Sequence, residues 1–158
     1  MSNNSKIFDI KELVSHVKFL KKKNLIIGFT NGCFDLLHMG HLTLLLQAKK
    51  KCDYLIIGLN SDLSVKNIKG ENRPVDNEED RIQNLSIRDE VDAIILFSEE
   101  TPLKIIKEII PNKLFKGSDY KKEIVVGAEF VIKNGGNVEF IDILEGYSTT
   151  NIINKTSI

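Results

Sequence analysis

Apolar residues in this chain follow two patterns that alternate along its length. Between residues 9 and 23 they recur every three or four positions, which predicts an amphipathic helix with Asp9 as its N-cap. The apolar positions of this helix are Ile10, Leu13, Val14, Val17 and Leu20. Short, almost unbroken apolar runs at 25–29, 54–59 and 93–97 instead predict strands that are buried on both faces.

The same reasoning extends to the rest of the chain. Further helices are expected at 41–50, 78–90, 102–110, 123–133 and 149–155. Further strands are expected at 113–115 and 138–143. Thr101 is expected to cap the helix that begins at Pro102. Residues 60–77 are polar and contain Gly70 and Pro74, so they predict a long loop that has room for one helical turn. Within it, residues 64–77 are expected to be mobile.

Strands and helices alternate about five times, which is typical of the α/β class. Because the strands lack polar alternation, they favour a parallel sheet covered on both sides. Right-handed crossovers then give a doubly wound, Rossmann-like parallel sheet of about five strands with helices on both faces. A length of 158 residues fits one domain.

Composition and charge exclude several classes of protein. Hydrophobic residues make up 42% and charged residues 28%, as in a globular protein. Lys plus Arg equals Asp plus Glu at 22 each, so no global basic field favours nucleic acid as a partner. Two cysteines exclude a disulfide framework and indicate a reducing compartment. No apolar run approaches the roughly 20 residues of a membrane helix, so we expect a cytoplasmic protein with no membrane partner.

The segment from Thr30 to His41, TNGCFDLLHMGH, carries the strongest chemical signal. His38 and His41 lie three residues apart at the expected start of a helix, so both imidazoles can face one ligand. A helix N-terminus attracts phosphate, and Gly40 lets phosphate approach the backbone. A zinc site would need a third ligand, and the only other histidine, His16, lies in the N-terminal helix, so no metal site is predicted.

Three other segments directly follow expected strands and so belong to the same edge of the sheet. Each also has a plain structural interpretation: a solvated loop at 59–74, a turn with a solvated lysine at 116–120, and a hydroxyl N-cap at 146–153. The polar side chains that they bring to this edge include Lys66, Lys69, Arg73, Lys116, Asp119, Ser148, Thr149 and Thr150.

These segments resemble a known family. The first resembles the T-x-G-x-F-D-x-x-H-x-G-H signature of the cytidylyltransferase-like nucleotidyltransferase superfamily, and 148–153 resembles its S-T-T-x-I-I signature. The runs N-S-D-x-S-V-K-x-x-K-G-x-x-R-P and K-G-x-D-Y are similar to those of the heptose 1-phosphate adenylyltransferase branch. Members of that branch often carry a fused sugar-kinase domain. These 158 residues match only the nucleotidyltransferase part, so the resemblance implies a stand-alone form. It implies a single nucleotidyltransferase domain over 1–158, with an N-terminal helix at 1–23 and a catalytic core at 24–158.

The resemblance also implies roles for individual residues. The catalytic residues it implies are His38, His41, Lys69 and Lys116. The nucleotide-binding residues it implies are Thr30, Asn31, Gly32, Cys33, Phe34, His38, Gly40, His41, Lys116, Asp119, Ser148, Thr149 and Thr150. The residues it implies for the second substrate are Asp35, Asn60, Lys66, Lys69 and Arg73. The chemistry needs no thiol nucleophile, so Cys33 is expected to be a packed residue of the loop.

The reaction implied is transfer of AMP from ATP to a sugar 1-phosphate, with Mg²⁺ held mainly by the nucleotide phosphates. A homodimer and a separate heptose 7-phosphate kinase are the expected protein partners. Two alternatives stay open: a cytidylyltransferase that joins CTP to glycerol 3-phosphate or another small phosphate, and a nucleotide-binding sensor without catalysis. Class I aminoacyl-tRNA synthetases share the H-x-G-H element, but they are far longer than this chain.

Overall fold

The computed structural model describes residues 3–118 and 125–143. Five strands form one sheet in the order β3-β2-β1-β4-β5, and every neighbouring pair is parallel. The strands are β1 (Ile27–Gly32), β2 (Tyr54–Asn60), β3 (Ala93–Phe97), β4 (Lys113–Gly117) and β5 (Asn137–Ile141). The predicted doubly wound parallel sheet is confirmed.

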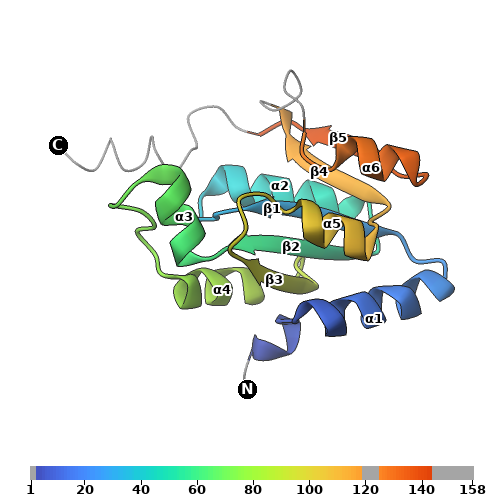
Figure 1. Ribbon diagram of the computed structural model, residues 1–158, viewed down its shortest axis with the longest axis horizontal. Coiled ribbons are helices and arrows are strands. Elements are labelled where there is room, and N and C mark those ends of the chain that lie inside the picture. Colours follow the sequence, from blue (N-terminus) through green and yellow to red (C-terminus); the bar gives the residue numbers. More distant parts are fainter. Residues whose placement is uncertain (1–2, 119–124, 144–158) are drawn as a thin grey trace.

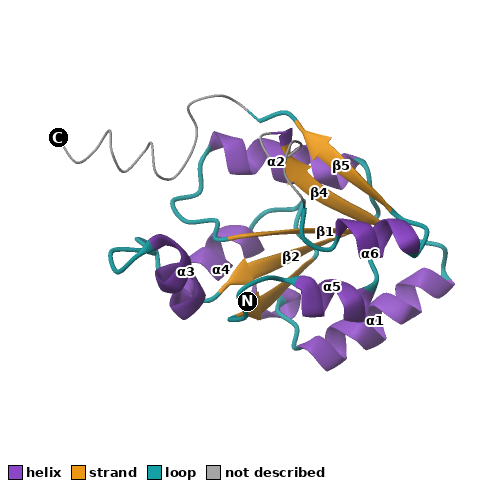
Figure 2. Ribbon diagram, turned by 45° about the horizontal axis from the view of Figure 1, so that its top comes forward, coloured by secondary structure: helices purple, strands orange, loops and turns teal. Residues whose placement is uncertain are grey.

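Helices cover both faces of this sheet, as Figures 1 and 2 show. The helices are α1 (Ile10–Lys22), α2 (Met39–Lys50), α3 (Asp62–Lys69), α4 (Glu78–Ser86), α5 (Leu103–Ile109) and α6 (Ala128–Lys133), with a 3₁₀ turn at Asn3–Lys6. Helices α1, α5 and α6 share one hydrophobic cluster with the sheet, and α2 and α4 share another. Within residues 3–118 and 125–143, no helix is long and apolar enough to cross a membrane.

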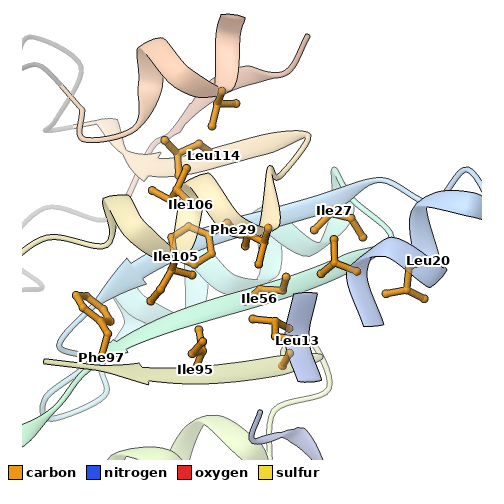
Figure 3. Close-up of a cluster of buried hydrophobic side chains, with 14 of the residues drawn as sticks. Leu13, Leu20, Ile27, Phe29, Ile56, Ile95, Phe97, Ile105, Ile106 and Leu114 are labelled. Carbon is orange, nitrogen blue, oxygen red and sulfur yellow. The ribbon is translucent and has the colours of Figure 1, made fainter. Parts of the chain in front are cut away.

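The two clusters lie on opposite faces because side chains alternate along each strand. On β2, Ile56 belongs to the α1 and α5 cluster, whereas Leu55 and Ile57 belong to the α2 and α4 cluster. Figure 3 shows Leu13 of α1 and Ile105 of α5 near the strand residues of the first cluster. Full burial of one such side chain contributes about 1.5–3 kcal/mol, so both layers stabilise the sheet.

The start of α1 follows the sequence prediction. The Asp9 carboxylate accepts a hydrogen bond from the Glu12 N–H at 2.8 Å, and the Glu12 carboxylate accepts from the Asp9 N–H at 3.3 Å. This reciprocal pair is a capping box, which satisfies N–H groups that the helix itself leaves unpaired.

The clearest error of the sequence prediction is the loop expected at 60–77. Residues 62–69 form α3, capped by the Ser61 hydroxyl, which accepts from the Ser64 N–H at 3.2 Å. Val65 is fully buried, and this tertiary contact stabilises a helix that its polar composition concealed. Gly70, with φ of 106°, ends the helix, so the expectation of a mobile loop from residue 64 is wrong over 64–69.

Other boundaries moved by a few residues. The first strand continues to Gly32, because Thr30 and Asn31 keep pairing with β2 although their side chains are polar. Pro102 holds the N-cap position of α5, which begins at Leu103, but the Thr101 hydroxyl does accept from the Leu103 N–H at 3.4 Å. The helices expected at 78–90 and 123–133 are shorter, at Glu78–Ser86 and Ala128–Lys133. The helix expected at 149–155 lies outside the described residues.

The strand order places a switch point between β1 and β4. The chain builds outward from β1 through β2 to β3, then returns to β4 on the other side of β1. The two crossovers from β1 and β4 therefore leave in opposite directions. In open α/β sheets this is where ligands bind, beyond the carboxyl ends of the strands.

Candidate active site

Two side-chain contacts join β1 and β4 near their carboxyl ends. Backbone pairing between the two strands covers only Gly28 with Lys113 and Phe29 with Leu114. Beyond it, the buried Thr30 hydroxyl donates to the Phe115 carbonyl at 2.9 Å. One residue further along, the Lys116 ammonium donates to the Asn31 side-chain carbonyl at 2.6 Å. At the switch point, polar side-chain contacts thus replace the backbone pairing between β1 and β4.

The histidine pair opens α2 at this same end of the sheet. His38 is the N-cap of α2 and His41 is its third residue. The two rings stack with centroids 3.8 Å apart and an interplanar angle of 23°. The sequence argument placed both residues on one helical face, whereas His38 precedes the first helical residue. The result for a ligand is the same, because both imidazoles lie together beside the first turn of the helix.

Both imidazoles use the same ring nitrogen to cap the helix. His38 Nδ1 accepts from the Gly40 N–H at 3.1 Å, and His41 Nδ1 accepts from the His38 N–H at 3.2 Å. An accepting nitrogen carries no proton, so the proton of each neutral ring resides on Nε2. The cap therefore sets the N–H donor of each neutral ring at Nε2.

The surroundings favour the neutral form of both rings. Burial lowers the pKa of His38 below its usual value. Burial also lowers the pKa of His41 to about 3, helped by the charges of His38 and Lys69 and opposed by Asp35. Two imidazolium ions at stacking distance would repel each other, which agrees with this direction. At neutral pH the pair consists of neutral hydrogen-bond donors.

The loop before α2 has a strained, packed backbone. Phe34 and Leu36 have φ values of 48° and 50°, in the left-handed region that favours glycine. The buried Phe34 ring lies 5.2 Å from the His41 ring, centroid to centroid, and holds it from one side. A Cβ added to Gly32 would lie 3.2 Å from the Phe34 ring, so a small residue suits this position. Burial raises the pKa of the Cys33 thiol, which fits a packed residue more than a nucleophile.

Lys69 reaches the histidines electrostatically from the end of α3. Its charge lowers the pKa of both His41 and Cys33, although burial is the larger cause for His41. Figures 1 and 2 show α3 at the end of the sheet where β2 finishes. Lys66 is exposed on the same helix. Lys66 and Lys69, which were expected in a long loop, therefore lie on a helix.

Asp35 is occupied by protein contacts. Its buried carboxylate accepts from Arg73 Nε at 3.1 Å, from the Val75 N–H at 2.8 Å and from the Asp76 N–H at 2.9 Å. Burial alone would raise the pKa of Asp35, but these donors hold it below its usual value. Asp35 thus fastens the segment after α3 to the histidine loop, and it draws the Arg73 guanidinium inward.

A buried arginine, which sequence reasoning missed, supports the same region. Arg81 of α4 is fully buried and donates to the Cys33 and Asn60 carbonyls at 2.8 and 2.7 Å. The Asn60 side chain is also engaged, because its amide donates to the Ser64 hydroxyl at 2.7 Å. The only sequence signal for Arg81 was its place four residues before Leu85, on the apolar side of the expected helix. A charged residue in a helix usually lies on the solvated face, so this signal was missed.

The structure brings together most of the predicted residues that it describes. Those at or beside the carboxyl ends of β1, β2 and β4 are Thr30, Asn31, Gly32, Cys33, Phe34, Asp35, His38, Gly40, His41, Asn60, Lys69, Arg73 and Lys116. Asp119, Ser148, Thr149 and Thr150 lie outside the described residues. Across residues 3–118 and 125–143, no group of three or more His, Cys, Asp or Glu side chains could hold a metal ion.

Comparison with known proteins agrees with this geometry. A family model described as cytidylyltransferase-like matches residues 29–155, which include the histidine loop. The chain belongs to the cytidylyltransferase-like family. Membership places it among the nucleotidyltransferases.

Relatives of this cytidylyltransferase-like chain include much longer proteins. "Bifunctional protein HldE" from Rhodopseudomonas palustris strain BisB5 is 51% identical over 135 residues, 85% of this chain and 28% of the relative. The protein of the same name from Granulibacter bethesdensis is 48% identical over 146 residues, 92% of this chain and 30% of the relative. The chain thus spans less than a third of the length of these relatives.

Two solved structures share the fold. The lipopolysaccharide core biosynthesis protein from Thermoplasma volcanium GSS1 is 28% identical with a TM-score of 0.63, over 78% of this chain and 99% of that one. Pantoate-beta-alanine ligase from Francisella tularensis is 20% identical with a TM-score of 0.62, over 86% of this chain and 66% of that one. The second likeness concerns the fold alone.

Proposed function

We propose that this chain transfers AMP from ATP to a sugar 1-phosphate, D-glycero-D-manno-heptose 1-phosphate, and releases pyrophosphate. The observation that carries the proposal is the pair of Nε2–H donors at the N-terminus of α2, next to the β1 and β4 switch point. The choice of sugar rests on the likeness of residues 60–74 and 116–120 to the heptose 1-phosphate adenylyltransferase branch. Relatives named "Bifunctional protein HldE", which are about 50% identical to this chain, support that choice.

The site suits this chemistry because the nucleophile is already an anion. An oxygen of the sugar phosphate attacks the α-phosphorus in line, and the bond from that phosphorus to the bridging oxygen breaks. Pyrophosphate leaves with the electron pair, so no strong base is required. The protein must bring two polyanions together and stabilise charge on the α-phosphate, which is a task of positioning and electrostatics.

Neutral imidazoles and lysines divide this task. The Nε2–H groups of His38 and His41 donate to phosphate oxygens without adding a charge that burial would penalise. Lys69 and Lys116 provide the positive charge, from α3 and from the end of β4. One preorganised donor aimed at developing charge is worth about 3–4 kcal/mol in other enzymes.

The remaining residues have several different roles in the proposal. Asn31, Gly32, Cys33, Phe34 and Gly40 shape the backbone beside the phosphates, and Asp119 and Ser148 to Thr150 bind the nucleotide in the proposal as the resemblance implies. Lys66 contacts the sugar phosphate. The side chains of Thr30, Asp35 and Asn60 are engaged with other protein groups, so their proposed contribution is to hold the site in shape. Arg73 bonds Asp35 through Nε, but its buried Nη2 has no hydrogen-bond partner among the described residues, so Arg73 stays a proposed contact for the second substrate.

Mg²⁺ and protein partners belong to the proposal as well. A magnesium ion prefers oxygen ligands and keeps several waters, and the site offers donors more than carboxylates, so the triphosphate would carry the ion. Its chemistry there would be to offset charge on the phosphate oxygens. A homodimer and a separate heptose 7-phosphate kinase complete the proposed setting.

The test is pyrophosphate release by the purified chain with ATP or CTP. Each nucleotide is paired with heptose 1-phosphates of both anomers, hexose 1-phosphates and glycerol 3-phosphate. The proposal predicts release with ATP and a heptose 1-phosphate. Release only with CTP and glycerol 3-phosphate would identify the cytidylyltransferase alternative. ATP binding by calorimetry without turnover on any acceptor would identify a nucleotide sensor.

A further inference from the structure

Arg81 is the largest fully buried side chain among the described residues, and its charge is enclosed by protein acceptors. Its Nη1 donates to the carbonyls of Cys33 and Asn60 at 2.8 and 2.7 Å. Its Nη2 donates to the Asp62 carboxylate at 2.7 Å, and its Nε donates to the Asp76 carbonyl at 3.1 Å. Four of the five N–H donors of the guanidinium are thereby used.

Each of the four acceptors belongs to a different segment around the candidate site. Cys33 lies in the loop that leads to the histidines, and Asn60 is the last residue of β2. Asp62 is the first residue of α3, and Asp76 lies between α3 and α4. The planar guanidinium fork fixes the directions of its partners, so these segments are held in one relative arrangement.

Core packing alone does not explain a charge at this position. A buried guanidinium carries a large desolvation penalty unless its hydrogen bonds are well made, and an apolar residue of similar volume would fill the space without it. Asp76 shows what the charge accomplishes: its carbonyl accepts from Arg81 while its N–H donates to Asp35. The segment after α3 is thus held from two sides.

We propose that Arg81 is a positioning residue for nucleotidyl transfer, because it holds Lys69 on α3 at a set distance from the imidazole pair. This inference rests on the proposed function. Arg81 is fully buried and acts only through the segments that it holds. Since Lys69 projects from the last turn of α3, a small rotation of that helix about its Arg81-bound start would move the ammonium away from His41.

Arg81→Lys tests this role because it keeps a positive charge near Asp62 but cannot bridge the Cys33 and Asn60 carbonyls with the same fork. We expect kcat to fall about 10- to 100-fold, since a misplacement of about 1 Å can cost that much. The KM for ATP should change less than about threefold, because the lost interaction acts mainly in the transition state. Leu85→Val is the control, since it loosens the core on the same helix but removes none of the Arg81 hydrogen bonds.

A double-mutant cycle with Lys69→Met separates positioning from general loosening. If Arg81 acts by placing Lys69, Arg81→Lys should lower kcat much less in the Lys69→Met background than in the wild type. Equal fold-losses in both backgrounds would overturn the proposal. Should Arg81→Lys fail to fold, Asp62→Ala removes one acceptor at a half-exposed position of α3 and enters the same cycle.

Hydrogen exchange keeps this inference separate from the proposed reaction. In Arg81→Lys, amides of residues 33–35 and 62–69 should exchange at least several-fold faster than in the wild type, whereas in Leu85→Val they should not. Unchanged exchange in these segments would overturn the positioning role even if the enzyme is active. A wild-type chain that releases no pyrophosphate with any acceptor would instead refute the proposed function, and exchange would still decide whether Arg81 holds the two segments.

Discussion

At the scale of single residues, the histidine pair shows how one side chain can serve structure and ligand together. His38 and His41 satisfy N–H groups at the start of α2 through Nδ1, and this leaves Nε2–H as the donor on the opposite side of each ring. The cap therefore sets the tautomer, and the tautomer sets the chemistry. An asparagine or serine cap would satisfy the helix equally well but would not present this pair of donors.

His41 should make the protein sensitive to acid. Its pKa is about 3 in the folded chain and about 6.5 when unfolded, so between these values the unfolded state binds more protons. Stability from this group is present above pH 6.5 and is lost as pH falls toward 3. In urea unfolding from pH 7.5 to 4, the wild type should lose more stability than His41→Asn, by up to about 1.4 kcal/mol per pH unit. Parallel curves for the two proteins would contradict the burial of a neutral imidazole.

Lys116 should matter more than a neighbouring lysine on the same strand. Lys116 meets Asn31 at the switch point, whereas Lys113, at the other end of β4, pairs with Glu139 at 2.8 Å. Lys116→Met should lower kcat/KM at least about 100-fold in pyrophosphate release, because it removes the positive charge that we propose contacts phosphate. Lys113→Met should stay within about twofold, since partly exposed ion pairs contribute about 1 kcal/mol or less to stability. Similar losses in both variants would remove Lys116 from the site.

Local contacts were predictable from the sequence where they depend on near neighbours. The Asp9 cap and the closeness of the His38 and His41 rings are such cases, because the groups involved lie three residues apart. The contacts of Asp35 with Arg73 and of Arg81 with Cys33 span 38 and 48 residues. Such contacts depend on how the strands assemble, and no local pattern announces them.

At the scale of elements, the apolar periodicity predicted most helices and strands but missed α3. That helix has only Val65 and Ser64 buried, and its short polar sequence has the composition of a loop. Its stability comes from the Ser61 cap and from packing on β2, and both depend on the preceding strand. The positive charge of the site was therefore predicted in the right segment but in the wrong conformation.

Close packing between β1 and β2 offers a test at this scale. A Cβ added to Gly58 on β2 would lie 2.7 Å from the Phe29 ring and 3.3 Å from the Asn31 Cβ. Gly58→Ala should therefore lower the free energy of unfolding by about 1–3 kcal/mol. In a Phe29→Leu background the added methyl gains room, so urea unfolding should show a smaller cost for Gly58→Ala. An unchanged cost in that background would refute the contact as the cause.

At the scale of the whole molecule, the strand order brings together segments that are distant in the sequence. Residues 30–41 and 113–118 are far apart in the sequence, and the order β3-β2-β1-β4-β5 makes β1 and β4 neighbours. Helices α1, α5 and α6 on one face and α2 and α4 on the other hold this arrangement through two separate hydrophobic clusters. The zero net charge of the chain is compatible with an anion site, because Lys69 and Lys116 lie at the end of α3 and near the end of β4, at the candidate site.

The central claim is that the imidazole pair stabilises the transferred phosphate, and turnover of two histidine variants tests it most directly. His16 is the matched control. It lies on α1, where its ring stacks with those of Phe8 and Phe19, away from the carboxyl end of the sheet. With ATP and heptose 1-phosphate, His41→Ala should lower kcat for pyrophosphate release by about 100-fold or more while His16→Gln stays near wild type. Near-normal turnover by a folded His41→Ala protein would contradict the account.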